Sequence, residues 1–150
     1  MNDESVPTRE AWGDIASDLD VEYGFRMFGG KTIEEATPVF AENPIERASE
    51  LSFTPAAVFN YYVFAFAAAA LSPASKGESD LASCFLRLVR TRAVEQPAGL
   101  ARVWTRLRGA VASVAERQAF YDADADIYGS FADLRHEAEA AMRQYEGHGT

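Results

Sequence analysis

The apolar positions of this chain are densest between residues 55 and 71, in the sequence PAAVFNYYVFAFAAAAL. Asn60 is the one clearly polar side chain there, and Tyr61 and Tyr62 are amphipathic. A helix that is apolar on all of its faces belongs inside a larger structure. Pro73 ends the stretch, because the residue before a proline avoids the helical region. The pattern therefore predicts a central helix over residues 55–71 that the rest of the chain covers.

The same stretch is a poor candidate for a membrane span. Spanning a bilayer takes roughly 20 apolar residues. This stretch has 17 residues, with Asn60 and two tyrosines near its middle and no basic flank. We therefore expect a core helix and no membrane partner.

Amphipathic patterns with helical spacing occupy most of the remaining chain, and no run alternates with the period of a strand. They predict helices over residues 8–27, 31–40, 44–51, 80–94, 98–121 and from residue 130 onward. Ser79 is the expected cap of the helix at residue 80, and residues 122–129 are an expected loop.

The first of these predicted helices, over residues 8–27, has a clear division of faces. Its apolar stripe consists of Trp12, Ile15, Leu19 and Tyr23. Its opposite face carries Asp14, Asp18 and Glu22. Gly13 and Gly24 weaken the helix, and we expect a break near Asp20.

Length and composition fit a single globular domain. The chain has 150 residues, of which 48% are hydrophobic and 25% charged, both ordinary values. The predicted fold is all-α: a single-domain bundle of about five to seven helices around the central helix, with loose ends at residues 1–7 and 147–150. The acidic, polar N-terminus does not resemble a signal peptide, and the single Cys84 allows no intramolecular disulfide. We expect a cytoplasmic protein.

Charge is distributed unevenly along the chain. The net charge is −9, yet residues 80–115 carry 2 acids and 6 bases. The basic face expected on these two helices centres on Arg87, Arg90, Arg102 and Arg106. Internal pairing with acidic residues is the favoured interpretation, and a nucleic-acid patch or a protein-docking surface are the alternatives. Nucleic-acid binding is disfavoured because the rest of the surface would repel phosphate.

The residues that could act as catalytic groups or metal ligands form no complete catalytic or metal-binding motif. Asp122, Asp124 and Asp126 have the spacing of a calcium loop, but Ile127 stands where the sharp turn needs glycine. The segment FGGKT at residues 28–32 ends like a phosphate-binding loop, but no strand precedes it. We therefore predict no catalytic residues, no metal site and no cofactor.

Three segments together resemble a known group of proteins. They are residues 28–35 (FGGKTIEE), 51–55 (LSFTP) and 59–66 (FNYYVFAF). This pattern is similar to that of a family of small uncharacterised bacterial all-helical proteins with an F-x-G-K turn before a Y-Y-x-x-A-F core helix. The resemblance covers about residues 28–71 and implies the helical fold. The family carries no activity that would extend to this chain.

Small size, acidity and a helical frame favour a non-catalytic protein-binding module, specifically an immunity or antitoxin-type inhibitor of a bacterial toxin. An acidic surface complements a basic partner and speeds its association. The predicted contact residues are Asp14, Asp18, Glu22, Asp122, Asp124 and Asp126. Two alternatives stay open: an enzyme or small-ligand binder with a pocket near residues 60–62, and a nucleic-acid or phage-defence module using the basic face of residues 87–108.

Overall fold

The computed structural model describes residues 5–148, and that part of the chain is helical with no strand, as the sequence predicts. The α-helices are α1 (Leu19–Phe28), α2 (Ile33–Glu42), α3 (Pro44–Ser52), α4 (Ala56–Leu71), α5 (Ser79–Glu95), α6 (Pro97–Ala115), α7 (Ala125–Tyr128) and α8 (Phe131–His148). Short 3-10 turns are η2 (Arg9–Trp12), η3 (Ile15–Ser17) and η4 (Pro73–Ser75). The predicted all-α, single-domain fold is confirmed.

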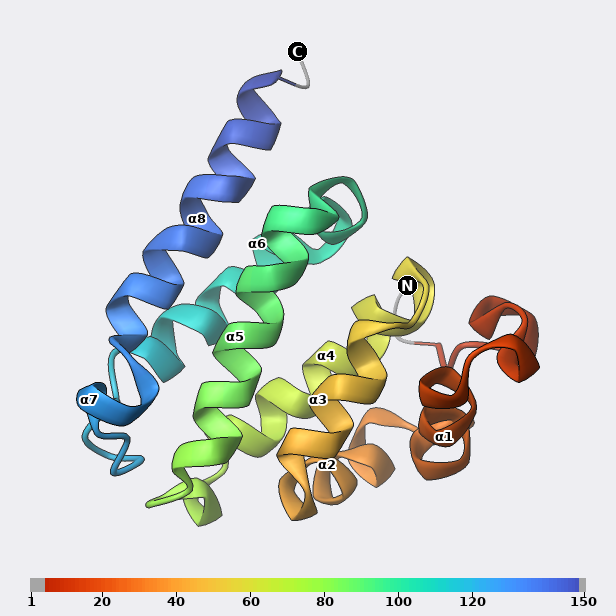
Figure 1. Cartoon of the computed structure of the whole chain (residues 1–150), viewed down its shortest axis with the longest axis horizontal. Coiled ribbons are helices and arrows are strands. Elements are labelled where there is room, and N and C mark those ends of the chain that lie inside the picture. Colours follow the sequence, from red (N-terminus) through yellow and green to blue (C-terminus); the bar gives the residue numbers. More distant parts are fainter. Residues whose placement is uncertain (1–4, 149–150) are drawn as a thin grey trace.

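The long helices alternate between two layers along the chain (Figure 1). One layer holds α1, α3, α5 and α8 side by side, and the other holds α2, α4 and α6. Helix α4 lies between α2 and α6 and also packs against α3 and α5. It begins after Pro55 and ends before Ser72, where the proline pattern places its ends. The predicted central helix is therefore confirmed.

Most side chains of helix α4 are buried because its neighbours supply closely fitting side chains, whereas Ala57 and Ala68 are exposed. The Phe66 ring lies 5.1 Å from that of Phe40 in α2 and 5.8 Å from that of Phe85 in α5, centroid to centroid. Gly99 lets α6 approach closely, since a Cβ there would lie 3.1 Å from the Cβ of Ala56. In the described part of the chain, no helix combines the length and apolar character that crossing a membrane requires.

The segment before α2 differs from the single helix predicted over residues 8–27. Gly13 takes a φ of +75°, a left-handed conformation that glycine adopts easily, and the chain forms two 3-10 turns before α1. Asp18 then caps α1, its carboxylate accepting from the amides of Asp20 (2.8 Å) and Val21 (3.3 Å). The helix therefore starts at Leu19, one residue before the break that we expected near Asp20.

This break changes which side chains of the segment are buried. Trp12 and Ile15 are buried as predicted. Leu19 and Tyr23 are 82% and 51% exposed, so the second half of the predicted apolar stripe is wrong. The buried face of α1 consists of Val21, Gly24 and Phe28. The prediction of one apolar stripe fails because residues before and after the break do not belong to one continuous helix. Helical spacing therefore does not place them on the same face.

Three other predicted boundaries also move. Glu78, not Ser79, is the N-cap residue of α5, because Ser79 is already helical; the Ser79 hydroxyl donates to the Tyr128 hydroxyl at 2.9 Å. Helix α6 ends at Ala115 instead of near residue 121, and the predicted loop 122–129 contains the single turn α7. Helix α8 continues to residue 148, so the start of the predicted C-terminal loose end is wrong. Residues 1–4 and 149–150, parts of the two predicted loose ends, lie outside the described residues.

A buried ion pair lies on α3. The Arg47 guanidinium donates from Nε to Glu50 Oε1 at 2.7 Å and from Nη2 to Oε2 at 2.9 Å. Both side chains are buried, and Gly24 brings α1 close, since a Cβ there would lie 3.2 Å from the Cβ of Glu50. Burial raises the pKa of the Glu50 carboxyl from its ordinary value of 4.5, although the hydrogen bonds from Arg47 oppose that shift.

We expect this carboxyl to make stability depend on pH. Its pKa is higher in the folded than in the unfolded chain, so its stabilising contribution is complete below pH 4.5 and is lost as pH rises through the raised pKa. Relative to the variant Glu50→Gln, which cannot titrate there, the wild-type free energy of unfolding should fall between pH 4.5 and 7. Urea titrations across that range measure the difference, with the exposed Glu42→Gln as the control. A wild-type advantage that grows with pH would contradict the assignment.

Candidate functional site

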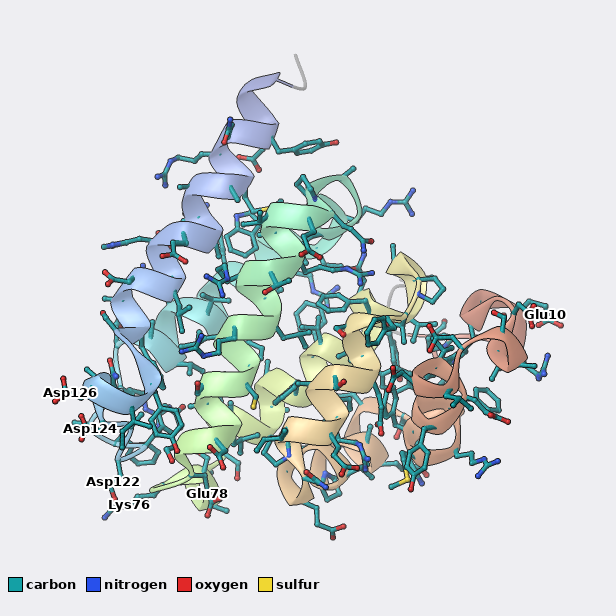
Figure 2. The ribbon with its side chains drawn as sticks, in the orientation of Figure 1. Glu10, Lys76, Glu78, Asp122, Asp124 and Asp126 are labelled. Atoms are coloured by element: carbon teal, nitrogen blue, oxygen red, sulfur yellow. The ribbon has the colours of Figure 1, made fainter. Side chains whose placement is uncertain are left out.

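Two loops join to form an acidic end of the bundle. The amide of Gly77, in the turn before α5, donates to the carbonyl of Phe120 after α6 at 3.0 Å. A Cβ at Gly77 would lie 3.8 Å from Asp122 Oδ2, so the two loops lie against each other. The resulting surface, here called the acidic end, consists of Glu78, Asp122, Asp124 and Asp126, with Lys76 beside it (Figure 2).

The side chain of Gln118 holds the second of these loops in place. Its Nε2 donates to the carbonyls of Ala123 (2.9 Å) and Gly129 (2.8 Å), and its Oε1 accepts from the amide of Phe131 (2.9 Å). One amide side chain therefore connects the end of α6, the loop and the start of α8. The carboxylates of the acidic end stand on a backbone that is already ordered.

The three aspartates of the acidic end do not lie as ligands around one point. Asp124 Oδ1 accepts from the amide of Asp126 at 2.9 Å and caps α7, and Ile127 is 72% exposed. The labelled carboxylates extend outward and do not converge (Figure 2). Among residues 5–148, no three or more histidine, cysteine, aspartate or glutamate side chains are placed to hold a metal ion.

The carboxylates predicted on the first helix are not brought together with the acidic end. Asp18 is occupied as the cap of α1, and Glu22 pairs with Arg26 at 3.7 Å on the surface. Asp14 is exposed at the start of η3. Glu10, in the neighbouring turn, lies on the opposite side of the molecule from Asp122 (Figure 2). The predicted contact residues therefore belong to two separate surfaces.

The arginines of α5 bind partners within the molecule. Arg87 donates to the carbonyl of Tyr128 at 2.6 Å, and Arg90 pairs with Glu137 of α8 at 2.7 Å. Arg92 is buried, and it donates to two backbone carbonyls at the end of α3.

The arginines of α6 point elsewhere. The guanidinium of Arg106 lies 4.3 Å from the ring centroid of Phe64 in α4. Arg102 is exposed and lines a cavity beside α4. Because Arg87, Arg90 and Arg106 contact α7, α8 and α4 respectively, they do not form one continuous basic face. Arg90 pairs with a carboxylate as predicted, whereas Arg87 donates to a backbone carbonyl.

The polar side chains of the central helix form hydrogen bonds with backbone groups of neighbouring segments. The Tyr62 hydroxyl donates to the carbonyl of Lys31 at 2.8 Å, and the Tyr61 hydroxyl accepts from the amide of Ile33 at 3.2 Å. Asn60 donates through Nδ2 to the carbonyl of Gly99 at 2.9 Å. A cavity of about 480 Å³ borders Asn60 and Tyr61. The ligand-binding alternative rests on this cavity, whereas the hydrogen bonds favour a role in packing.

The thiol of Cys84 is poorly suited to act as a catalytic nucleophile. Burial raises the pKa of the Cys84 thiol to about 11, and the nearby carboxylate of Asp80 acts in the same direction. Such a thiol is almost entirely protonated at neutral pH, and only the thiolate is a good nucleophile. These properties are those of a structural cysteine.

A feature that the sequence did not predict is a row of grooves between the helices of the α1–α3–α5–α8 layer. The groove between α5 and α8 measures about 900 Å³, that between α3 and α5 about 420 Å³, and that between α1 and α3 about 240 Å³. Thr91 and Glu95 of α5 line both of the first two grooves. The apolar residues near the ends of α3 and α5 are visible in the sequence. Their exposure was not predictable, because it depends on how far neighbouring helices diverge.

Comparison with known proteins returned no match for this chain among protein-family models, curated proteins or solved structures. The resemblance of residues 28–71 to a family of small helical bacterial proteins therefore stays a prediction.

Proposed function

We propose that this chain is a non-catalytic protein-binding module that docks a basic partner, and that the partner is a bacterial toxin neutralised by the contact. The observation that carries the proposal is the acidic end, where two loops present four carboxylates, Glu78, Asp122, Asp124 and Asp126, beside the exposed base Lys76. The Gln118 hydrogen bonds hold the loop that carries Asp122, Asp124 and Asp126 in place before any partner arrives. An ordered surface loses less conformational entropy on binding than a mobile one.

Electrostatics supports a basic partner over an acidic or neutral one. The chain as a whole carries a net charge of −9, so its field attracts cations over a distance of about 10 Å at ordinary ionic strength. Such a field raises association rates with basic proteins and repels other acidic ones. Inhibition would follow from occupying the basic surface with which a toxin holds its own anionic target.

The test neutralises the acidic end while keeping its shape. The variant Glu78→Gln, Asp122→Asn, Asp124→Asn and Asp126→Asn removes four charges, and asparagine retains both the capping oxygen at position 124 and the tolerance for the positive φ at position 122. A matched control, Glu10→Gln, Asp14→Asn, Asp18→Asn and Glu22→Gln, removes four charges from the N-terminal segment, three of them at predicted contact residues.

Capture from a lysate of the source cell should retain one basic protein in stoichiometric amount with the wild type and with the control. The acidic-end variant should lose at least tenfold in affinity for that protein. Expression of the captured protein alone should stop growth, and coexpression of the wild-type chain should restore it. Absence of a stoichiometric partner, a partner that is not toxic, or equal capture by the two variants would each refute the proposal.

A further inference from the structure

The grooves of the α1–α3–α5–α8 layer are lined in part by exposed apolar side chains of a kind that is usually buried. Phe53, at the end of α3, is 53% exposed, and Val94, near the end of α5, is 58% exposed. Both line grooves, as do the exposed Leu19 and Tyr23 of α1. Contiguous exposed apolar surface bordered by polar groups marks interaction sites in soluble proteins.

These grooves belong to one face of the molecule, here called the grooved face. Helices α3, α5 and α8 run in the same direction within their layer (Figure 1), and the grooves on the two sides of α5 share Thr91 and Glu95. On α3, Ser49 lines one groove and Phe53 the next, four residues further along. Residues four apart lie on the same side of a helix, so these two grooves open on the same side of α3.

The charges of the grooved face indicate the chemistry of its occupant. Its exposed carboxylates are Asp20, Glu46, Glu95 and Glu137. The partly buried Arg90 is paired with Glu137, and the other charged groups that line these grooves, Glu50 and Arg92, are buried. An apolar floor between acidic rims fits a segment that is apolar on one side and basic on the other. A second copy of this chain fits less well, because two molecules of charge −9 repel each other.

We infer that the grooved face docks an amphipathic helix of basic character, with its apolar side on Val94 and Phe53 and its basic side chains beside Glu95. Amphipathic helices bind in this way in many helix-in-groove complexes, with apolar anchors spaced one helical turn apart. The inference rests on the proposed protein-binding function and adds a second contact to it: the acidic end attracts the partner, and the grooved face holds a helix of that partner.

A defined probe tests the grooved face without knowledge of the native partner. The probe is a fluorescein-labelled 18-residue peptide of leucine and lysine whose leucines share one helical face. Its control is an isomer of the same composition in which the leucines are distributed around the helix. Fluorescence anisotropy at 150 mM salt should show binding of the amphipathic peptide at least tenfold tighter than that of the isomer.

Variants locate the contact. The double variant Phe53→Gln and Val94→Gln should weaken binding of the amphipathic peptide at least tenfold. The control Ile127→Gln, which removes an exposed apolar side chain at the acidic end, should change it by less than twofold. Circular dichroism establishes that each variant is folded. Equal affinity for the two peptides, no effect of the double variant, or a wild-type dimer that the double variant dissociates would overturn the inference, as would failure of the amphipathic peptide to bind.

Two combined outcomes separate this inference from the proposed function. If the double variant still captures the native partner with wild-type affinity while the acidic-end variant does not, the grooved face is refuted as a docking surface and the proposed function stands. If no native partner is captured but the amphipathic peptide binds selectively, the grooved face stands and the toxin-inhibitor function is refuted.

Discussion

Replacing Phe66 with alanine should lower the free energy of unfolding by about 3–5 kcal/mol, the usual cost of removing a fully buried phenylalanine. Phe66 has no exposed surface and lies between Phe40 of α2 and Phe85 of α5. It therefore connects the two layers at the centre of the molecule. Removal leaves a cavity that three helices border, and helices packed this closely relax into a cavity only in part.

The matched control is Phe64→Ala, two residues earlier on the same helix. Phe64 is only partly buried, and its ring faces the guanidinium of Arg106 at 4.3 Å. Its loss should cost about 1–2 kcal/mol because less apolar area is withdrawn from water. Urea denaturation followed by circular dichroism measures both variants. Equal costs at the two positions would contradict the assignment of Phe66 to the interlayer core.

The second large effect is expected at Arg92. Its Nη1 and Nη2 donate to the carbonyls of Ser52 (3.3 Å) and Thr54 (2.9 Å), and its guanidinium lies 4.1 Å from the ring centroid of Phe59. Arg92→Ala removes both donors from the chain between α3 and α4 and the cation–π contact. The free energy of unfolding should fall by about 2–4 kcal/mol, given the usual costs of unsatisfied buried carbonyls and of lost cation–π contacts.

Arg90→Ala is the control for Arg92→Ala, because the two arginines are two residues apart on α5. Arg90 forms a partly exposed ion pair with Glu137, and such pairs contribute about 0–1 kcal/mol. Thermal and urea unfolding measure the loss in free energy of unfolding for each variant and so compare the contributions of Arg90 and Arg92 to stability. Similar losses would mean that Arg92 is no more than a surface residue, in contradiction to its burial.

The fold was predictable where the composition of a single segment is enough to indicate its burial and its ends. The segment over residues 55–71 is apolar on all faces and bracketed by prolines, so its central position and its ends follow from the sequence alone. The helices predicted from residues 80 and 98 onward were recognisable for a similar reason, since α5 and α6 run unbroken over 17 and 19 residues. The N-terminal segment was not, because a left-handed Gly13 and the cap at Asp18 divide a pattern that looks continuous.

The candidate surfaces were predictable only in part, because they depend on contacts between distant segments. Asp122, Asp124 and Asp126 stand out in the sequence, but Glu78 joins them only through the contact of Gly77 with Phe120. The arginines of α5 and α6 read as one basic block, yet burial of Arg92 and ion pairing of Arg90 are decided by α3, α4 and α8. The grooves depend on divergence between helices, which no local pattern encodes.

Helix α5 joins the acidic end, at its first turn, to the grooved face, near its last. With 17 residues it has a length of about 25 Å at 1.5 Å per residue. An α-helix is stiff over that distance, so α5 acts as a molecular ruler between the two surfaces. A partner that used both would have to present its basic patch and its amphipathic helix at that same separation, which makes spacing, as much as charge, a criterion by which this protein would select among basic proteins.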